Sequence, residues 1–260
     1  MLSKYKKAII TTTLLAISTY SFADMKDCAL ASANQDDKDI VEYCTPYLKD
    51  KNNPEATASL AGATKSYKKS LDYSLWYANF YDDKKSQMSK NETETYTSAL
   101  NIVGNIYYFG QAGKADKAKG LEYITKAASL GNDFAQKQLG GMYVSGQNGE
   151  ITTNIATGYK WTEIAIANGS QDAKNGYLSV NLDGFKKETP YCIGMGEQLV
   201  AQAYLDGTAG LSKDKSKAKK YLSQAIAIYK DNEPTKESYK YCAKQKGLDL
   251  ASAEKLLGSL

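Results

Sequence analysis

The sequence predicts an all-α protein in which short helical repeats stack into a solenoid. The main observation is one motif in three copies: an aromatic residue, a glycine three residues later, then a small residue, an aromatic and an alanine at offsets 0, +3 and +7. Such offsets place side chains on one stripe of a helix. The second observation is the period of 36 to 38 residues between the first two copies, which is typical of helical repeats. The copies are Tyr107, Gly110, Gly120, Tyr123 and Ala127; Tyr143, Gly146, Gly158, Trp161 and Ala165; and Tyr204, Gly207, Ala218, Tyr221 and Ala225.

The motif predicts how the two helices of each repeat meet. A glycine or alanine where helices cross lets the backbones approach closely, and the aromatic at +3 fills the groove beside the crossing. We therefore interpret the motif aromatics as core residues and not as ligand-binding residues: Tyr107, Tyr123, Tyr143, Trp161, Tyr204 and Tyr221.

The chain is predicted to have four regions. Residues 1–23 are a targeting segment, residues 24–98 a helical region with an atypical repeat, residues 99–231 the regular array, and residues 232–260 capping helices. An insertion at about 185–196, which contains Pro190 and Cys192, is expected to interrupt the array.

Individual helices follow from the apolar spacing and from glycine and proline signals. In the region before the array, two short helices are expected up to Leu48, Pro54 is expected to begin the next helix, and residues 67–81 should bury Leu71, Leu75 and Trp76. The polar stretch 84–94 is interpreted as a loop or a solvated helix start. Within the array, helices are expected at 96–109, 114–130 and 173–184 (the first helix of a broken copy), and further copies at 135–169 and 197–227. After the array, helices are expected at 237–245 and 250–257.

The N-terminus has the pattern of a secretory signal peptide. Lys4, Lys6 and Lys7 precede an apolar stretch at 8–20, and Ser21-Phe22-Ala23 provides small residues at −3 and −1 of a cleavage site. The prediction is export to the periplasm, with full secretion as the alternative, and an uncleaved membrane anchor remains open. No other segment is long and apolar enough to suggest a membrane span.

The charge balance argues against nucleic acid as a partner. All 33 positive residues are lysines, and three of them belong to the targeting segment, which leaves 30 against 29 acidic residues. A nucleic-acid binder is expected to show a clustered basic face, usually with arginine. The lysine-rich run at 213–220 is interpreted as a solvated helix start.

Four cysteines in an exported chain favour two disulfides, although sequence alone allows three pairings. We expect the local arrangement, in which Cys28 pairs with Cys44 and Cys192 pairs with Cys242. Zinc is the weaker alternative, because no C-x-x-C spacing and no histidine is present.

The missing residue types disfavour most enzymatic chemistry. The chain has no histidine, hence no ordinary general base near neutral pH and no common partner for a nucleophilic serine or cysteine. It also lacks a phosphate-binding glycine loop and known metal-binding signatures. Paired carboxylates could still support glycoside hydrolysis, but no spacing singles out a pair. We predict no catalytic residue, no cofactor and no metal.

Two segments resemble a known family. Leu139-Gly140-Gly141-Met142-Tyr143-Val144-Ser145-Gly146 with Gly158-Tyr159-Lys160-Trp161, and the run Lys213 to Leu222, are similar to Sel1-like repeats, which are related to tetratricopeptide repeats. The resemblance covers about 99–227. It implies a right-handed α-solenoid of antiparallel helix pairs that binds other proteins on its concave side.

The resemblance implies a non-enzymatic interaction scaffold that organises an envelope complex, with a type VI secretion apparatus as one kind of client. A cysteine-rich branch of the family is associated with β-lactams, but it has paired cysteines inside each repeat, which this chain lacks. Two alternatives to the scaffold function stay open: a cell-wall or β-lactam-acting enzyme, and a secreted virulence or immunity protein that binds a toxin. Candidate protein-binding residues, placed off the core on first helices, are Tyr108, Gln111, Gln138, Lys174 and Asn181.

Overall fold

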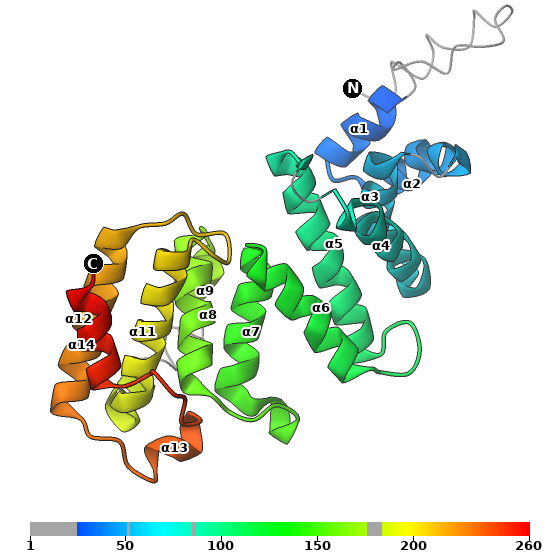
Figure 1. Ribbon diagram of the computed structural model, residues 1–260. Helices are drawn as coiled ribbons and strands as arrows, with labels where there is room; N and C mark the ends of the chain where they lie inside the picture. Colours follow the sequence, from blue (N-terminus) through cyan, green and yellow to red (C-terminus); the bar gives the residue numbers. More distant parts are fainter. Residues whose placement is uncertain (1–24, 51–52, 85–86, 176–183) are drawn as a thin grey trace, which may run out of the picture. The chain divides into compact units, whose positions relative to one another are not determined.

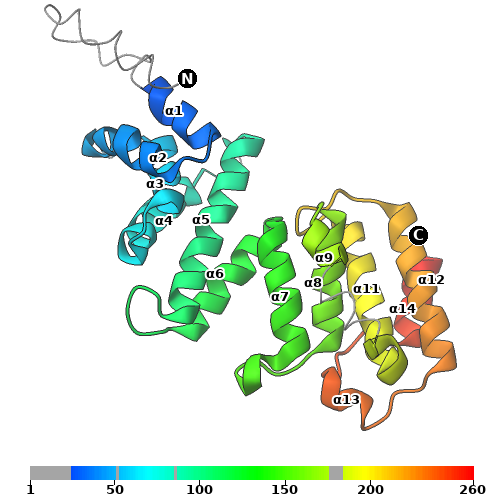
Figure 2. The ribbon, with the colours of Figure 1, turned by 180° about the vertical axis from the view of Figure 1, so that it is seen from behind.

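The computed structural model describes residues 25–50, 53–84, 87–175 and 184–260, and every regular element within these ranges is a helix. Figures 1 and 2 show the helices from opposite sides. The predicted all-α class is therefore confirmed. The chain divides into two compact units, residues 1–64 and 65–260, and the predicted signal peptide lies outside the described residues.

The first unit is a small cluster of helices held by a disulfide. It contains α1 (Met25–Ala33), α2 (Asp37–Cys44), the 3₁₀-helix η2 (Thr45–Asp50) and α3 (Pro54–Ala63). Asn53 caps α3, and Pro54 occupies its first turn as predicted, where a missing N–H costs nothing. The disulfide Cys28–Cys44 joins α1 to the end of α2, and this confirms the first predicted pairing.

The second unit is a succession of antiparallel helix pairs, each packed on the next. The pairs are α5/α6, α7/α8 and α11/α12, and further contacts link α4 to α5, α6 to α7, α8 to α11 and α12 to α14. The predicted helical solenoid is confirmed. The helices of this unit are α4 (Tyr67–Asp82), α5 (Lys90–Phe109), α6 (Lys117–Ser129), α7 (Asp133–Ser145), α8 (Ile155–Ala167), α9 (Gln171–Asn175), α11 (Pro190–Asp206), α12 (Lys215–Asp231), α13 (Ser238–Tyr241) and α14 (Leu250–Gly258), with the 3₁₀-helix η4 (Gly146–Gly149).

The small residue of the motif lies where the two helices of a pair cross. A Cβ added to Gly120 on α6 would lie 2.5 Å from the backbone nitrogen of Tyr108 on α5. In the next pair, a Cβ on Gly158 would lie 3.1 Å from the carbonyl oxygen of Gly140. The predicted packing role of the small residue is therefore confirmed in these two copies.

The turn between the paired helices is also shared by the three copies. Gly110, Gly146 and Gly207 end the first helices with φ between 65° and 67°, which glycine adopts without the penalty of a Cβ. The residue that caps the second helix then donates its backbone N–H to the carbonyl oxygen of the motif tyrosine. These bonds join Asp116 to Tyr107 at 2.8 Å, Asn154 to Tyr143 at 2.9 Å and Asp214 to Tyr204 at 3.0 Å.

The motif aromatics contribute to packing within the pairs, as the sequence predicted. The rings of Tyr107 and Tyr123 stack with centroids 6.2 Å apart, and those of Tyr204 and Tyr221 stack at 5.8 Å. Trp161 is buried as well. The tyrosines at 107, 123, 143 and 221 keep partial solvent access, so they border the core instead of lying at its centre.

The prediction for the buried face of α4 is wrong. Leu71, Leu75 and Trp76 are partly exposed, whereas the helix buries Ser70, Ser74, Tyr77, Ala78 and Tyr81. Because α4 packs on α5, serine and alanine allow a close approach that leucine would prevent, and the tyrosines bring polar tips that can be hydrogen-bonded.

Helix α5 starts earlier than expected because a capping box begins it. The Ser89 side chain accepts from the backbone N–H of Glu92, and the Glu92 side chain accepts from the backbone N–H of Ser89. Glu92 Oε1 also accepts from the Tyr81 hydroxyl at 2.7 Å. The hydrogen bonds that Glu92 accepts lower its pKa to about 2, with the largest contribution from Ser89 and a smaller one from Tyr81.

Residues 185–196 are not the irregular insertion that the sequence suggested. Residues 184–188 are helical, and α11 begins at Pro190 and continues without a break to Asp206. Proline is compatible with a helix in the first turn, so it marks a start here. Of the predicted broken copy at 173–184, α9 covers the beginning, and 176–183 lie outside the described residues.

The C-terminal part packs on α11 and α12 and is fixed to the array by the second predicted disulfide. Cys192 in the first turn of α11 is bonded to Cys242, which follows α13. The helix expected at 237–245 is shorter, at Ser238–Tyr241, and the one expected at 250–257 is present as α14.

Candidate functional site

A hollow of the second unit lies along the first helices of successive repeats. It has a volume of about 320 Å³ and is lined by residues from the end of α5, from α7, from η4 and from α9. The lining residues are Phe109, Lys137, Gln138, Gly141, Met142, Gln147 and Asp172. We call this hollow the α5–α7 pocket.

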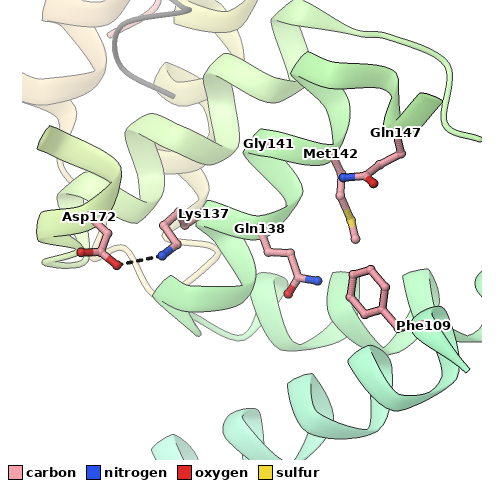
Figure 3. A pocket seen from close by; sticks show the side chains of 7 residues that line it. All are labelled: Phe109, Lys137, Gln138, Gly141, Met142, Gln147 and Asp172. Atoms are coloured by element: carbon pink, nitrogen blue, oxygen red, sulfur yellow. Dashed lines mark hydrogen bonds and ion pairs between the residues drawn. The ribbon is translucent and has the colours of Figure 1, made fainter. Parts of the chain in front are cut away.

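Two exposed aromatic rings lie at or near this pocket, on α5 and α7. Phe109 at the last position of α5 is 56% exposed, and Phe134 in the first turn of α7 is 53% exposed. Figure 3 shows the Met142 side chain pointing toward the Phe109 ring. Contact between large apolar side chains and water is unfavourable, so burying these side chains against a partner stabilises the complex.

The polar side of the pocket is organised by Lys137 and Gln138. The Lys137 ammonium lies 2.9 Å from the Asp172 carboxylate on α9 and 4.7 Å from the centre of the Phe134 ring. Gln138 donates from Nε2 to Asn105 Oδ1 on α5 at 2.7 Å. These contacts connect neighbouring first helices and hold the polar lining in place.

The lining of the pocket offers groups that are suited to binding. Its lining offers an aromatic ring, a thioether, two amides and one cation already paired with a carboxylate. In the part of the chain that the structure describes, no cluster of three or more metal-ligating side chains occurs. None of the described helices combines the length and apolar character needed to cross a membrane.

The structure divides the predicted binding residues into several groups. Gln138 lines the pocket. Gln111 and Lys174 are exposed, each two positions after a lining residue, and neither belongs to the lining. Asn181 lies outside the described residues.

The expectation that Tyr108 lies off the core is wrong. Tyr108 is 3% exposed, and its backbone forms the crossing with Gly120. The Tyr108 hydroxyl donates a hydrogen bond to Glu150 Oε2 at 3.3 Å. Burial is the largest cause that raises the pKa of the Tyr108 phenol, and the Glu150 carboxylate raises it further. Glu150 is also paired with Lys117. The next residue, Phe109, points to the surface instead.

The sequence analysis missed Phe109 and Phe134, although the sequence contains a signal for Phe109. Phe109 lies two residues after Tyr107, and the corresponding positions after Tyr143 and Tyr204 are Ser145 and Asp206. A phenylalanine where the other copies have polar residues indicates a position selected for something other than the core. Aligning the copies at solvent-facing positions would have found it.

The helix pairs with their exposed first-helix surface define the class of protein: a TPR-like helical solenoid. The family model "Sel1 repeat" matches residues 97–132, 133–170 and 192–227. The chain therefore belongs to the Sel1 repeat family. The third match agrees with the start of α11 at Pro190 and with the absence of a long insertion.

Two solved structures are similar to this chain. A Sel1 repeat protein from Oxalobacter formigenes has 22% sequence identity and a TM-score of 0.41, over 74% of this chain and 46% of that one. A protective antigen of uropathogenic Escherichia coli strains with an SLR fold has 16% identity and a TM-score of 0.31, over 85% of this chain and 59% of that one. The chain thus spans about half the length of these proteins. No match to a curated protein reaches significance.

Proposed function

We propose that this protein is a non-enzymatic, exported scaffold that organises a complex of the cell envelope by binding a protein partner. The observation that carries the proposal is the α5–α7 pocket, a hollow lined by the half-exposed Phe109, with the half-exposed Phe134 next to the lining residue Lys137. Sel1 repeat proteins are generally protein-interaction scaffolds, so a partner protein is the occupant that fits both the fold and the surface.

Export to the periplasm is supported by the signal pattern at 1–23 and by the two disulfides. Disulfides of this kind persist in oxidising compartments. By analogy with the family, an envelope machine such as a type VI secretion apparatus is the class of client that we propose. Gln111 and Lys174 are proposed as additional partner contacts around the pocket.

The partner's side of the contact is expected to be apolar. A pocket of about 320 Å³ accepts a bulky side chain, and aromatic residues at the rim can act as anchors that contribute more than the surrounding polar contacts. The Lys137–Asp172 pair would lie at the polar rim, where it favours one orientation of the partner over others.

The test compares a Phe109→Ala/Phe134→Ala variant with the wild type in affinity purification of the tagged full-length protein from periplasm. We expect the recovered envelope partner to fall roughly tenfold or more, because two anchors of about 1 kcal/mol or more each are removed. Tyr67→Ala is the matched control, since Tyr67 is 52% exposed and does not line the pocket.

Equal recovery by the double variant would contradict the pocket as the binding surface. If the purified mature protein hydrolysed nitrocefin or peptidoglycan, the scaffold function itself would have to be replaced by an enzymatic one. Both variants should fold normally, because all three aromatic side chains are more than half exposed.

A further inference from the structure

Glu197 is the exception at one buried position that the three repeats share. It lies seven residues before Tyr204, and the equivalent residues before Tyr107 and Tyr143 are Leu100 and Gln136. Leu100 and Gln136 are 0% exposed and Glu197 is 4% exposed. The same core position therefore holds an apolar, a neutral polar and an ionisable side chain.

Gln136 shows how a polar group is accommodated at this position. Its Nε2 donates to the carbonyl oxygens of Ala128 at 2.8 Å and Ala209 at 2.9 Å. Its Oε1 accepts from Asn168 Nδ2 at 2.9 Å. Because its donors and its acceptor are all paired, burial of this amide costs little.

Glu197 has no comparable set of partners. Its Oε1 accepts from the Tyr159 hydroxyl on α8 at 2.7 Å, while Oε2 is buried and has no hydrogen-bond partner in the described part of the chain. Gly196 allows the Tyr159 ring to lie close, since a Cβ there would be 2.7 Å from the ring. The carboxyl group is thus held in the contact between α8 and α11 with one oxygen unsatisfied.

The charged and titratable groups around Glu197 come from three segments. On α8 they are Tyr159 and Glu163, whose Oε2 accepts from the Tyr221 hydroxyl of α12 at 3.0 Å. Lys220 on α12 and Lys186 before α11 supply the positive charges. Helix α13 contacts α11 nearer its start, through the Cys192 disulfide and the Tyr191–Tyr239 ring pair.

These surroundings disfavour the ionised form of Glu197. Burial is the largest effect and Glu163 adds repulsion, whereas the Tyr159 hydrogen bond and the two lysines act in the opposite direction. Together they raise the pKa of the Glu197 carboxyl to about 7. Both lysines are exposed, so solvent weakens their attraction.

We propose that Glu197 is a proton-binding switch that sets how firmly α11 is held against α8. When protonated, it is a neutral core group that accepts the Tyr159 hydrogen bond. When ionised, it places a charge with one unpaired oxygen between the two helices, and the contact weakens. The switch lies at the junction where α11 packs directly on α8.

The direction of the pH effect follows from the two states. The unfolded chain ionises near the ordinary value of 4.5, and the folded protein near 7, so the folded state binds more protons between these values. The free energy of stabilisation that the Glu197 carboxyl contributes is fully present below pH 4.5 and is lost as the pH rises through 7. From pH 5 to pH 8, the ratio of folded to unfolded protein is expected to fall roughly 70-fold through this group alone.

The experiment compares the full-length protein with Glu197→Gln, which is close in shape and stays neutral. Urea unfolding at pH 5, 6, 7 and 8 should show the wild type losing stability relative to Glu197→Gln as the pH rises. After division by the intrinsic exchange rate at each pH, the protection of the amides in residues 190–206 should fall over the same range. Residues 117–129 on α6 are the internal reference. Glu122→Gln, an exposed glutamate on α6, is the control and should follow the wild type.

A second measurement does not depend on any variant that alters the charge. The ¹³C carboxyl resonance of Glu197 in the folded wild type should titrate with a midpoint near 7. In Tyr159→Phe the midpoint should move upward, since the lost hydrogen bond favours the ionised form. A midpoint near 4.5, or a stability difference from Glu197→Gln that does not change between pH 5 and 8, would overturn the proposal.

Discussion

Gly120→Ala is expected to destabilise the second unit by about 2 kcal/mol, a large effect for the addition of one methyl group. The new Cβ would lie 2.5 to 2.6 Å from the backbone nitrogen and Cα of Tyr108, so α5 and α6 must separate or shift. Overpacking of this kind costs about 1 to 3 kcal/mol or more. Alanine's better helix propensity, worth about 1 kcal/mol, offsets only part of it. Urea unfolding measures the loss.

The matched control is Gly258→Ala at the end of α14, where an added Cβ has nothing within 4 Å. This variant should differ from the wild type by less than about 0.5 kcal/mol. If Gly120→Ala were equally neutral, α5 and α6 would not cross at this glycine. The third copy has Ala218 at the same motif position, so its pair α11/α12 must cross with room for a Cβ.

Removing the Cys192–Cys242 disulfide is expected to have the largest effect of any substitution considered for this chain. The bond closes a loop with a sequence separation of 50 residues, and restricting the unfolded chain over that length contributes about 4 kcal/mol in the loop-entropy model. Both cysteines are 0% exposed, so Cys192→Ala/Cys242→Ala removes a buried contact as well. Thermal and urea unfolding of the oxidised proteins would measure the difference.

The Cys28→Ala/Cys44→Ala variant is the comparison, because its bond spans a separation of only 16 residues. The same model gives about 3 kcal/mol for that loop, so the order of the two losses is the discriminating result. If the C-terminal variant unfolded at the same urea concentration as the wild type, the attachment of α13 to α11 would be unimportant for stability.

The repeat pattern was sufficient to predict the packing of the array. Offsets of 0, +3 and +7 place Gly120, Tyr123 and Ala127 on one helix stripe, and a small residue on such a stripe lets another helix approach closely. The glycine after each motif tyrosine predicted the end of the first helix, because few other residues adopt that backbone conformation at low cost. Local chemistry thus determined the helix pairs.

The candidate site was only partly predictable. Gln138 was predicted to lie on the partner-facing side, and it lines the pocket. Tyr108 was predicted to contact a partner but is buried, whereas its neighbour Phe109, for which no role was predicted, lines the pocket. Which of them points inward depends on the rotation of α5 about its axis against α6, and the spacing of residues within α5 does not contain that information.

The sequence by itself determined that this chain is a solenoid of helix pairs, because repetition and capping are properties of neighbouring residues. It also indicated the two local disulfides. Tertiary structure alone decided which face of α4 is buried, that α11 begins at Pro190, that Phe109 lines the same pocket as Lys137, and that Glu197 lies between α8 and α11. These features depend on side chains that come together from distant segments. The free energy of each side chain in the folded protein is set there by its burial and its partner groups, and not by spacing along one helix.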